Sequence, residues 1–148
     1  MLNSTASRRL ACAALLFLTA PAPADAQEVG SSWNVRILDA QRQLKSEATL
    51  QFTDEAAKSC MRGKWKRVVV DPVAGGNAAF FPLAEPLAYR LQHGVLTIGR
   101  TSVCNRYLFL SGTTADKDIH GTYKAVSAGR SRQLGLFTMA PVLTRTQE

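Results

Sequence analysis

The sequence has few of the groups that enzymes use for chemistry. It contains only two histidines, His93 and His120, and three cysteines. Nucleophilic catalysis needs a base held beside a nucleophile, and both histidines fall in segments whose composition predicts turns. No Gly-x-Ser-x-Gly motif, Walker phosphate loop or dinucleotide-binding glycine motif occurs. We therefore expect a protein that is not an enzyme and that uses no cofactor.

The longest apolar run lies at the N-terminus. Arg8 and Arg9 precede the apolar block of residues 10–20, and a small-x-small sequence ends at Ala26. A basic start, an apolar block and a small-residue cleavage site are the parts of a secretory signal peptide. The block is shorter than the roughly 20 apolar residues that cross a bilayer as a helix. We expect no membrane span and a mature protein in the periplasm or outside the cell.

Cleavage near Ala26 divides the chain into a signal peptide, residues 1–26, and a single domain, residues 27–148. Two other interpretations of the N-terminus fit less well. Cys12 precedes most of the apolar block, whereas a lipoprotein cysteine follows it. The arginine pair resembles a twin-arginine export signal, but Ala11-Cys12 stands where a hydrophobic residue is usual. General secretion is therefore the favoured route.

Acidic residues are in short supply. The chain has 18 lysines and arginines against 11 acidic residues. Loss of Arg8, Arg9 and Asp25 with the signal peptide leaves 16 against 10, a net charge of +6. A surplus of this size on a small domain attracts anionic partners over long range. The remaining residues, about 120, can bury one modest core and are expected to form one domain.

Three cysteines become two when the signal peptide is removed, because Cys12 leaves with it. Cys60 and Cys104 then form an even count in an oxidising compartment, where only one intramolecular pairing is open to them. We expect a disulfide, worth about 4 kcal/mol in the chain-entropy model. The alternative is a pair of buried free thiols.

Short segments of alternating apolar and polar residues recur along the mature chain, as in strands with one buried face. In the first, Trp33, Val35 and Ile37 are expected to point inward. The residues of 53–58, with a capping threonine and two acids, predict a single helical turn. The predicted strands are 33–37, 48–52, 65–70, 89–92, 95–98, 101–112, 121–126 and 133–139.

The connections between these segments carry turn signals. Residues 39–46 are polar and predict a turn, and His93-Gly94 predicts a tight hairpin. Residues 74–86 contain glycines and prolines but also Phe80 and Phe81, which would be costly to expose. We expect this loop to fold back over one end of the core. Seven or eight short strands at near-regular spacing predict an all-β antiparallel fold, either an up-and-down barrel or a sandwich.

A family resemblance follows from this pattern. The Trp33 strand, the meander of hairpins, one disulfide and the closing pair Gly121-x-Tyr123 and Gly135-x-Phe137 resemble small exported calycin-type barrels. That group includes lipocalin-like binding proteins and bacterial inhibitors of secreted proteases. The lipocalin Gly-x-Trp is absent, since serine precedes Trp33. The resemblance implies binding, of a small apolar ligand inside the barrel or of a protein at its rim.

Residues 62–67 have the most distinctive local composition, four cations around one indole. Such a cluster can grip anionic groups while the ring stacks on a partner. Alternation places Lys64 and Lys66 on the face opposite Trp65. The structural alternative is a strand whose tryptophan is core and whose cations are solvated. The candidate partner-binding residues are Arg62, Lys64, Trp65, Lys66 and Arg67, and nucleic acid is the least expected partner of an exported protein.

A second candidate site is an apolar pocket inside the barrel. Tyr107 and Phe109 share one face of the predicted strand 101–112, with Cys104, Leu108 and Leu110 on the other. A barrel of eight strands holds either packed side chains or one small ligand, and we favour a packed interior, with both faces buried and one of them beneath the loop of Phe80 and Phe81. The candidate pocket residues are Trp33, Tyr89, Tyr107 and Phe109.

No metal site is predicted. Residues 116–121 resemble the opening of a calcium loop, with oxygen ligands at alternate positions and a glycine at the sixth. The resemblance ends at the twelfth position, where Ser127 stands in place of a bidentate glutamate, and His120 is a poor calcium ligand. A solvated hairpin loop explains the composition better.

We therefore expect an exported, non-catalytic binding protein that acts through its surface on a protein or an anionic envelope component. Inhibition of a hydrolase is one such function. One alternative is a carrier of a small apolar ligand. Another is an uncharacterised hydrolase whose carboxylates converge only in the folded chain. The identity of the partner and the oligomeric state stay open.

Overall fold

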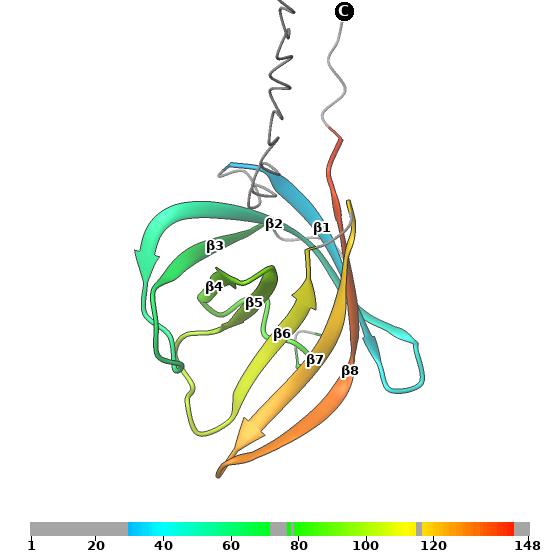
Figure 1. Ribbon diagram of the computed structural model, residues 1–148. Coiled ribbons are helices and arrows are strands. Elements are labelled where there is room, and N and C mark those ends of the chain that lie inside the picture. Colours follow the sequence, from blue (N-terminus) through cyan, green and yellow to red (C-terminus); the bar gives the residue numbers. More distant parts are fainter. Residues whose placement is uncertain (1–29, 72–76, 78, 115–116, 144–148) are drawn as a thin grey trace, which may run out of the picture.

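The computed structural model describes residues 30–71, 77, 79–114 and 117–143. Within them the chain forms a closed barrel in which each strand pairs with the next and β8 pairs with β1 (Figure 1). The expected signal peptide and its cleavage site lie outside the described residues. The strands are β1 (Ser32–Asp39), β2 (Leu44–Ala57), β3 (Trp65–Asp71), β4 (Leu87–Gln92), β5 (Val95–Arg100), β6 (Tyr107–Thr113), β7 (Ile119–Ser127) and β8 (Arg130–Pro141).

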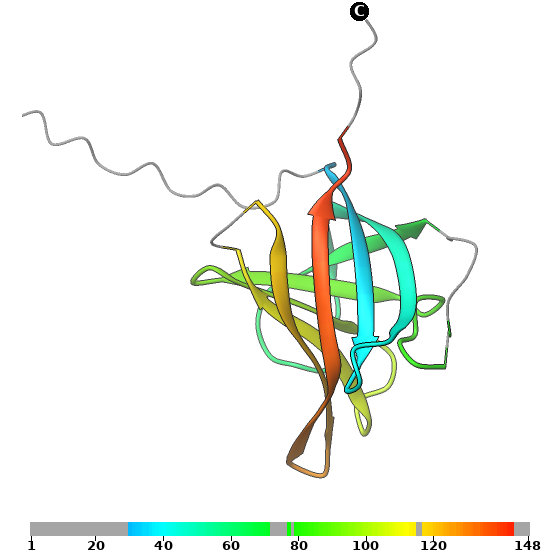
Figure 2. The same cartoon turned by 90° about the vertical axis from the view of Figure 1, so that its right-hand side faces the viewer.

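All eight pairings are antiparallel, so the all-β prediction is confirmed and the barrel, not the sandwich, is the architecture. The strands are not equally inclined. Figure 2 shows β4 and β5 crossing at a steep angle to β1 and β8. Within the described residues, no helix is long and apolar enough to cross a membrane.

Alternation along the strands produces the core. Val35 and Ile37 of β1 point inward and are fully buried, and Trp33 is half-buried against them. On β2 the expected residues Ala48, Leu50 and Phe52 are buried, while their neighbours Thr49 and Gln51 are partly exposed. The large fully buried side chains include Phe52, Phe81, Leu87, Leu96, Ile98, Leu110, Ile119, Tyr123, Phe137 and Met139.

The segment before β4 closes one end of the barrel, as predicted. Phe81 is fully buried, and the rings of Phe80 and Phe81 meet the ring of Tyr123 edge to face at 5.1 and 5.4 Å. The Tyr123 hydroxyl donates a hydrogen bond to the Phe80 carbonyl. The predicted turn at Gly75-Gly76 lies outside the described residues.

The expected helical turn at residues 53–58 is wrong, because β2 continues to Ala57. Its register against β3 shifts between Phe52 and Ala56, so residues 53–55 bulge. The hydroxyl of Thr53, expected to cap a helix, donates to the Arg67 carbonyl across the strands. Pairing with β3 gives the segment backbone partners and cross-strand ion pairs, which outweigh the weak preference of a single helical turn.

Other strand boundaries also differ from the sequence prediction, most clearly those of β2 and β6. β2 begins at Leu44, so the turn after β1 is shorter than residues 39–46; the Asp39 carboxylate organises it by accepting bonds from the Gln41 and Gln43 amides. Residues 101–106 are a connection, and β6 begins only at Tyr107. The predicted hairpin at His93-Gly94 is confirmed, with φ of 51° and 72°.

Candidate functional site

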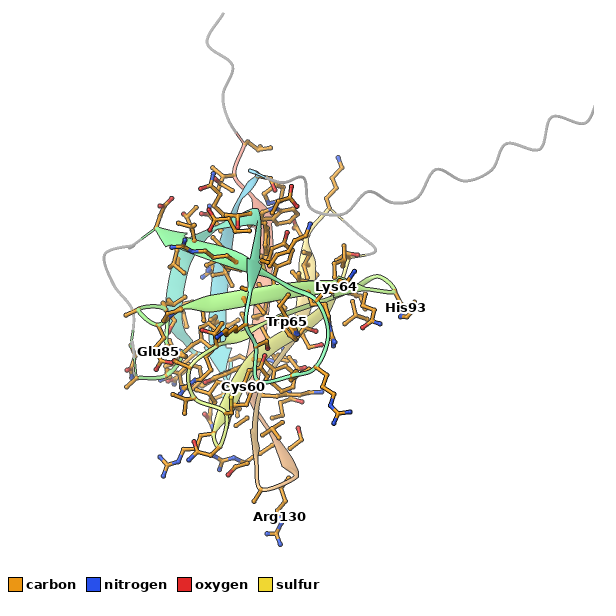
Figure 3. The ribbon with its side chains drawn as sticks, turned by 90° about the vertical axis from the view of Figure 1, so that its left-hand side faces the viewer. Cys60, Lys64, Trp65, Glu85, His93 and Arg130 are labelled. Atoms are coloured by element: carbon orange, nitrogen blue, oxygen red, sulfur yellow. A yellow bond between two sulfur atoms is a disulfide. The ribbon has the colours of Figure 1, made fainter. Side chains whose placement is uncertain are left out.

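The connection between β2 and β3, residues 58–64, runs along the outside of the barrel; we call it the strap. Cys60 in the strap forms a disulfide with Cys104 in the β5–β6 connection, with Cα atoms 5.1 Å apart, which confirms the predicted bond. Connections of an up-and-down barrel alternate between its two ends, so these two connections begin at opposite ends. Figure 3 shows the strap crossing in front of the wall, with Cys60 below Trp65.

Under the strap lies a cluster of side chains that is separate from the barrel core. Tyr107 is 3% exposed and Trp65 4% exposed, yet neither belongs to the interior cluster. A Cβ added at Gly99 would lie 2.1 Å from the Tyr107 hydroxyl oxygen, so the tyrosine ring covers this glycine on the outer face. Phe109 stacks on Tyr107 with ring centroids 5.5 Å apart. The Ser59 and Tyr107 hydroxyl oxygens are 3.4 Å apart, which ties strap to wall.

Arg90 locks the second half of the strap. Its guanidinium carbon lies 5.0 Å from the centre of the Trp65 ring, a cation–π contact. The Arg62 carbonyl accepts hydrogen bonds from Arg90 Nη1 at 2.9 Å and from Trp65 Nε1 at 3.4 Å. The strap backbone is therefore held by a disulfide at one point and by an arginine and an indole two residues later.

Arg90 was not among the candidate residues predicted from the sequence. Its signal was a charged residue between the apolar Tyr89 and Leu91 in a predicted strand. Alternation places Arg90 on the outer face, but only the course of the strap shows that this face is covered. Its Nε is buried without a hydrogen-bond partner among the described residues.

The cations of the basic cluster have different surroundings. Lys66 forms an ion pair with Asp54, and Arg67 Nη1 lies 3.0 Å from Glu55 Oε2, both across the β2–β3 pair. The hydrogen bond to Asp54 raises the pKa of Lys66. Trp65, the first residue of β3, is buried under the Arg90 guanidinium.

Arg62 and Lys64 are the two cations of the cluster that lie on the strap itself. Both are exposed, and neither takes part in an ion pair in the part of the chain that the structure describes. Gly63 between them has a φ of 117°, a left-handed conformation that glycine adopts without strain. Figure 3 places Lys64 on the same side as His93, at the tip of the β4–β5 hairpin.

The four candidate pocket residues do not converge. Tyr89 points into the barrel, where its ring contacts Phe52 at 4.6 Å and its hydroxyl donates to the Thr53 carbonyl. Tyr107 and Phe109 lie stacked on the outer face, where Tyr107 contacts the strap, and not under the loop of Phe80 and Phe81. Trp33 is half-buried at the start of β1 and donates from Nε1 to Ser31 Oγ. Burial raises the pKa of both Tyr89 and Tyr107.

Two surface grooves lie elsewhere. One, of about 550 Å³, lies on the outer wall of β1, β7 and β8 and is lined by Leu38, Arg42, His120 and Leu136 among others. The other, of about 300 Å³, lies between β3 and residues 83–87. Within the described ranges, no group of three or more His, Cys, Asp or Glu residues could hold a metal ion.

Comparisons with known proteins identify no relative, so the functional argument depends on the fold and the site. No family model, no curated protein and no solved structure matches the chain. The resemblance to calycin-type barrels extends to the architecture, an antiparallel closed barrel of eight strands. The strap, with the exposed Arg62 and Lys64 of the basic cluster, is therefore the candidate site.

Proposed function

We propose that this chain is an exported, non-catalytic binding protein that recognises an acidic partner protein through the strap. The observation that carries the proposal is the pair Arg62 and Lys64, exposed on a segment that is fixed to the barrel wall. A hydrolase whose cleft is lined by carboxylates is one such partner, and the chain would then act as its inhibitor.

The fixed backbone of the strap favours recognition over simple solubility. A binding loop that is already ordered loses less conformational entropy on association than a free loop. The Cys60–Cys104 disulfide and the bonds to the Arg62 carbonyl order the strap before any partner arrives. Opposite charges at defined positions then contribute to specificity and to the association rate.

A protein partner fits this geometry better than an anionic envelope polymer. The two cations flank Gly63, so their spacing is set by one short stretch of ordered backbone. Carboxylates held on a folded surface can match such a spacing, and an arginine can bind one of them through two parallel hydrogen bonds. A flexible polymer would be attracted mainly by the total charge, which cations elsewhere on the surface supply equally well.

Other features support the remaining parts of the proposal. A disulfide is typical of exported proteins. The non-catalytic part of the proposal is supported by Asp54 and Glu55, the two adjacent acids of β2, because both are engaged in ion pairs with β3. The carrier alternative remains a prediction, and the fully buried rings of Phe52, Tyr123 and Phe137 inside the barrel weigh against it.

Affinity capture with three baits tests the proposal. Wild-type protein, an Arg62→Gln/Lys64→Gln variant and a Lys66→Gln/Arg67→Gln variant would each be incubated with the exported fraction of the native cell at moderate salt. Both variants remove two charges, so the second controls for net charge. We expect wild type and the control to retain the same protein and the strap variant to lose it.

Two outcomes contradict the proposal. In one, the wild-type bait retains no protein at moderate salt. In the other, both variants lose the partner to the same extent, which would mean that total charge and not the strap decides binding. Raising the salt concentration should weaken the wild-type complex, because exposed charges are screened.

A further inference from the structure

The first part of β8 has a free edge, although the barrel is closed. β8 runs from Arg130 to Pro141, but its pairing with β1 starts only at Gly135, which faces Asp39. Residues 130–133 therefore pair with β7 alone, and Leu134 pairs with neither β7 nor β1, among the residues that the structure describes. Figures 1 and 2 show this part of the β7–β8 hairpin projecting beyond the barrel.

The hairpin geometry tells which backbone groups face outward. Ala128 and Gly129 form a two-residue turn with φ of 47° and 74°, the left-handed pair of a type I′ turn. The residues that flank such a turn, Ser127 and Arg130, exchange both backbone hydrogen bonds, and bonded and non-bonded pairs then alternate. Ser131, opposite Val126, is a non-bonded position.

Gln133 is the second non-bonded position, opposite Lys124. The N–H and C=O groups of Ser131 and Gln133 therefore point away from β7, toward the side that β1 leaves open. Both residues are exposed. Two donors and two acceptors in a row are what a strand edge offers to an added extended segment. Leu134, at the register shift that follows, ends the free edge.

The charged side chains of the β7–β8 hairpin itself are of one sign. Residues 119–141, which form β7, the turn and β8, contain Lys124, Arg130 and Arg132 and no acidic residue. Arg130 and Arg132 alternate with the two outward-bonding residues and are exposed. Charged residues on a free edge oppose pairing with a second copy of the same edge. The same charges attract a segment that carries carboxylates.

We infer that the edge of β8 at residues 130–134 binds an extended, acidic peptide segment of a partner protein by strand addition. The backbone bonds come from Ser131 and Gln133, and the arginines select carboxylates at alternate positions of the added strand. This site stands apart from the strap. Figure 3 shows Arg130 at the tip of the hairpin, far from Lys64.

A peptide titration followed by NMR and amide hydrogen exchange tests the inference. The probe is a blocked seven-residue peptide, Thr-Glu-Val-Glu-Val-Glu-Thr, and the comparison peptide has glutamine at each glutamate. We expect the acidic probe to shift and protect the amides of Ser131 and Gln133 in full-length mature protein. The glutamine peptide should bind about tenfold more weakly, because charge-assisted bonds are lost.

Proline substitutions separate the edge from the hairpin itself. In Ser131→Pro the lost N–H is one that does not bond to β7, so the hairpin should survive while probe binding falls at least tenfold. Proline is tolerated on edge strands where its nitrogen faces solvent. Gln133→Pro is the second variant should the first fail to fold. Arg130→Gln/Arg132→Gln should weaken the probe but leave the hairpin amides protected.

The variant Lys66→Gln/Arg67→Gln, which also removes two charges outside both proposed sites, serves as the matched control and should bind the probe like wild type. The inference is overturned if the acidic probe leaves the amides of Ser131 and Gln133 unprotected. It is also overturned if a folded Ser131→Pro protein binds the probe unchanged. Equal loss in the Lys66→Gln/Arg67→Gln variant and the edge variant would show attraction by net charge alone and would likewise overturn it.

Discussion

The barrel interior and the strapped outer wall both bury aromatic side chains, but they do so by different means. In the interior, Phe52 and Tyr89 are enclosed because alternation along paired strands turns them toward one axis. On the wall, Trp65 and Tyr107 would face water if the chain did not cross over them. The interior therefore makes the fold, whereas the wall is a separate layer held by a few contacts.

The largest expected effect comes from the interior. Phe52→Ala should lower the free energy of unfolding by about 3–5 kcal/mol, because it removes a fully buried ring and leaves a cavity. Urea unfolding monitored by circular dichroism measures the change. A loss well below 1 kcal/mol would contradict the view that the interior, and not the wall, dominates stability.

Removal of the disulfide should have the next largest effect and should reveal the two layers. Cys60→Ser/Cys104→Ser is expected to lower the free energy of unfolding by about 2–4 kcal/mol, chiefly by freeing the unfolded chain. The folded variant should keep its barrel but loosen the strap. In a Trp33→Phe background, where Trp65 is the only indole left, its fluorescence should shift to the red. Unchanged emission would mean that the wall cluster holds without the bond.

The buried Tyr123 makes the stability of the barrel interior depend on pH. Burial raises the pKa of Tyr123 to about 12, against a countering effect of Arg100. Because the pKa is higher in the folded chain than in the unfolded chain, ionisation of the hydroxyl favours unfolding. The stability that the neutral hydroxyl gives to the folded chain is complete below about pH 10 and is lost as pH rises toward 12. The free energy of unfolding should accordingly fall across that window.

Tyr123→Phe isolates the contribution of this group. At neutral pH the variant should lose about 1 kcal/mol, because the Phe80 carbonyl loses its hydrogen-bond donor. Between pH 10 and pH 12 its stability should decline less steeply than that of wild type. Denaturant titrations at pH 8, 10 and 11.5 provide the comparison. Parallel curves for variant and wild type would refute the assignment to Tyr123.

The smallest effect is expected at the ion pairs beside the strap. Glu55→Gln/Arg67→Gln should change the free energy of unfolding by at most about 1 kcal/mol, since both side chains are more than half exposed. Thermal unfolding of the single and double variants measures the coupling between them. A coupling of several kcal/mol would show that the β2 bulge, and not the strap contacts, orders this side of the barrel.

The interior could be predicted from sequence because its signal is local. Val35, Ile37, Leu50 and Phe52 follow a period of two, and that period is the geometry of a strand. The antiparallel all-β fold followed from the number and spacing of such segments, whereas the closed barrel, as opposed to a sandwich, is shown only by the pairing of β8 with β1. The helical turn at residues 53–58 was predicted wrongly because its composition is also local, while the pairing with β3 that overrides it is not.

The outer wall could not be predicted in the same way. Nothing in the neighbours of Tyr107 shows that a segment more than 40 residues earlier in the chain covers it, although the Cys60–Cys104 pairing, with a separation of 44, indicated that the two regions meet. The five residues of the basic cluster were found, but their division into paired, buried and exposed groups depends on tertiary contacts. Arg90 was missed for the same reason.

The dissociation constant of the captured partner is the most direct test of the claim that a fixed strap presents the binding cations. It would be measured by calorimetry for wild type, Arg62→Gln/Lys64→Gln and folded Cys60→Ser/Cys104→Ser at one salt concentration. We expect both variants to bind at least about tenfold more weakly, a cost of about 1.4 kcal/mol, the second without loss of any charge. Wild-type affinity in the cysteine variant would contradict the account.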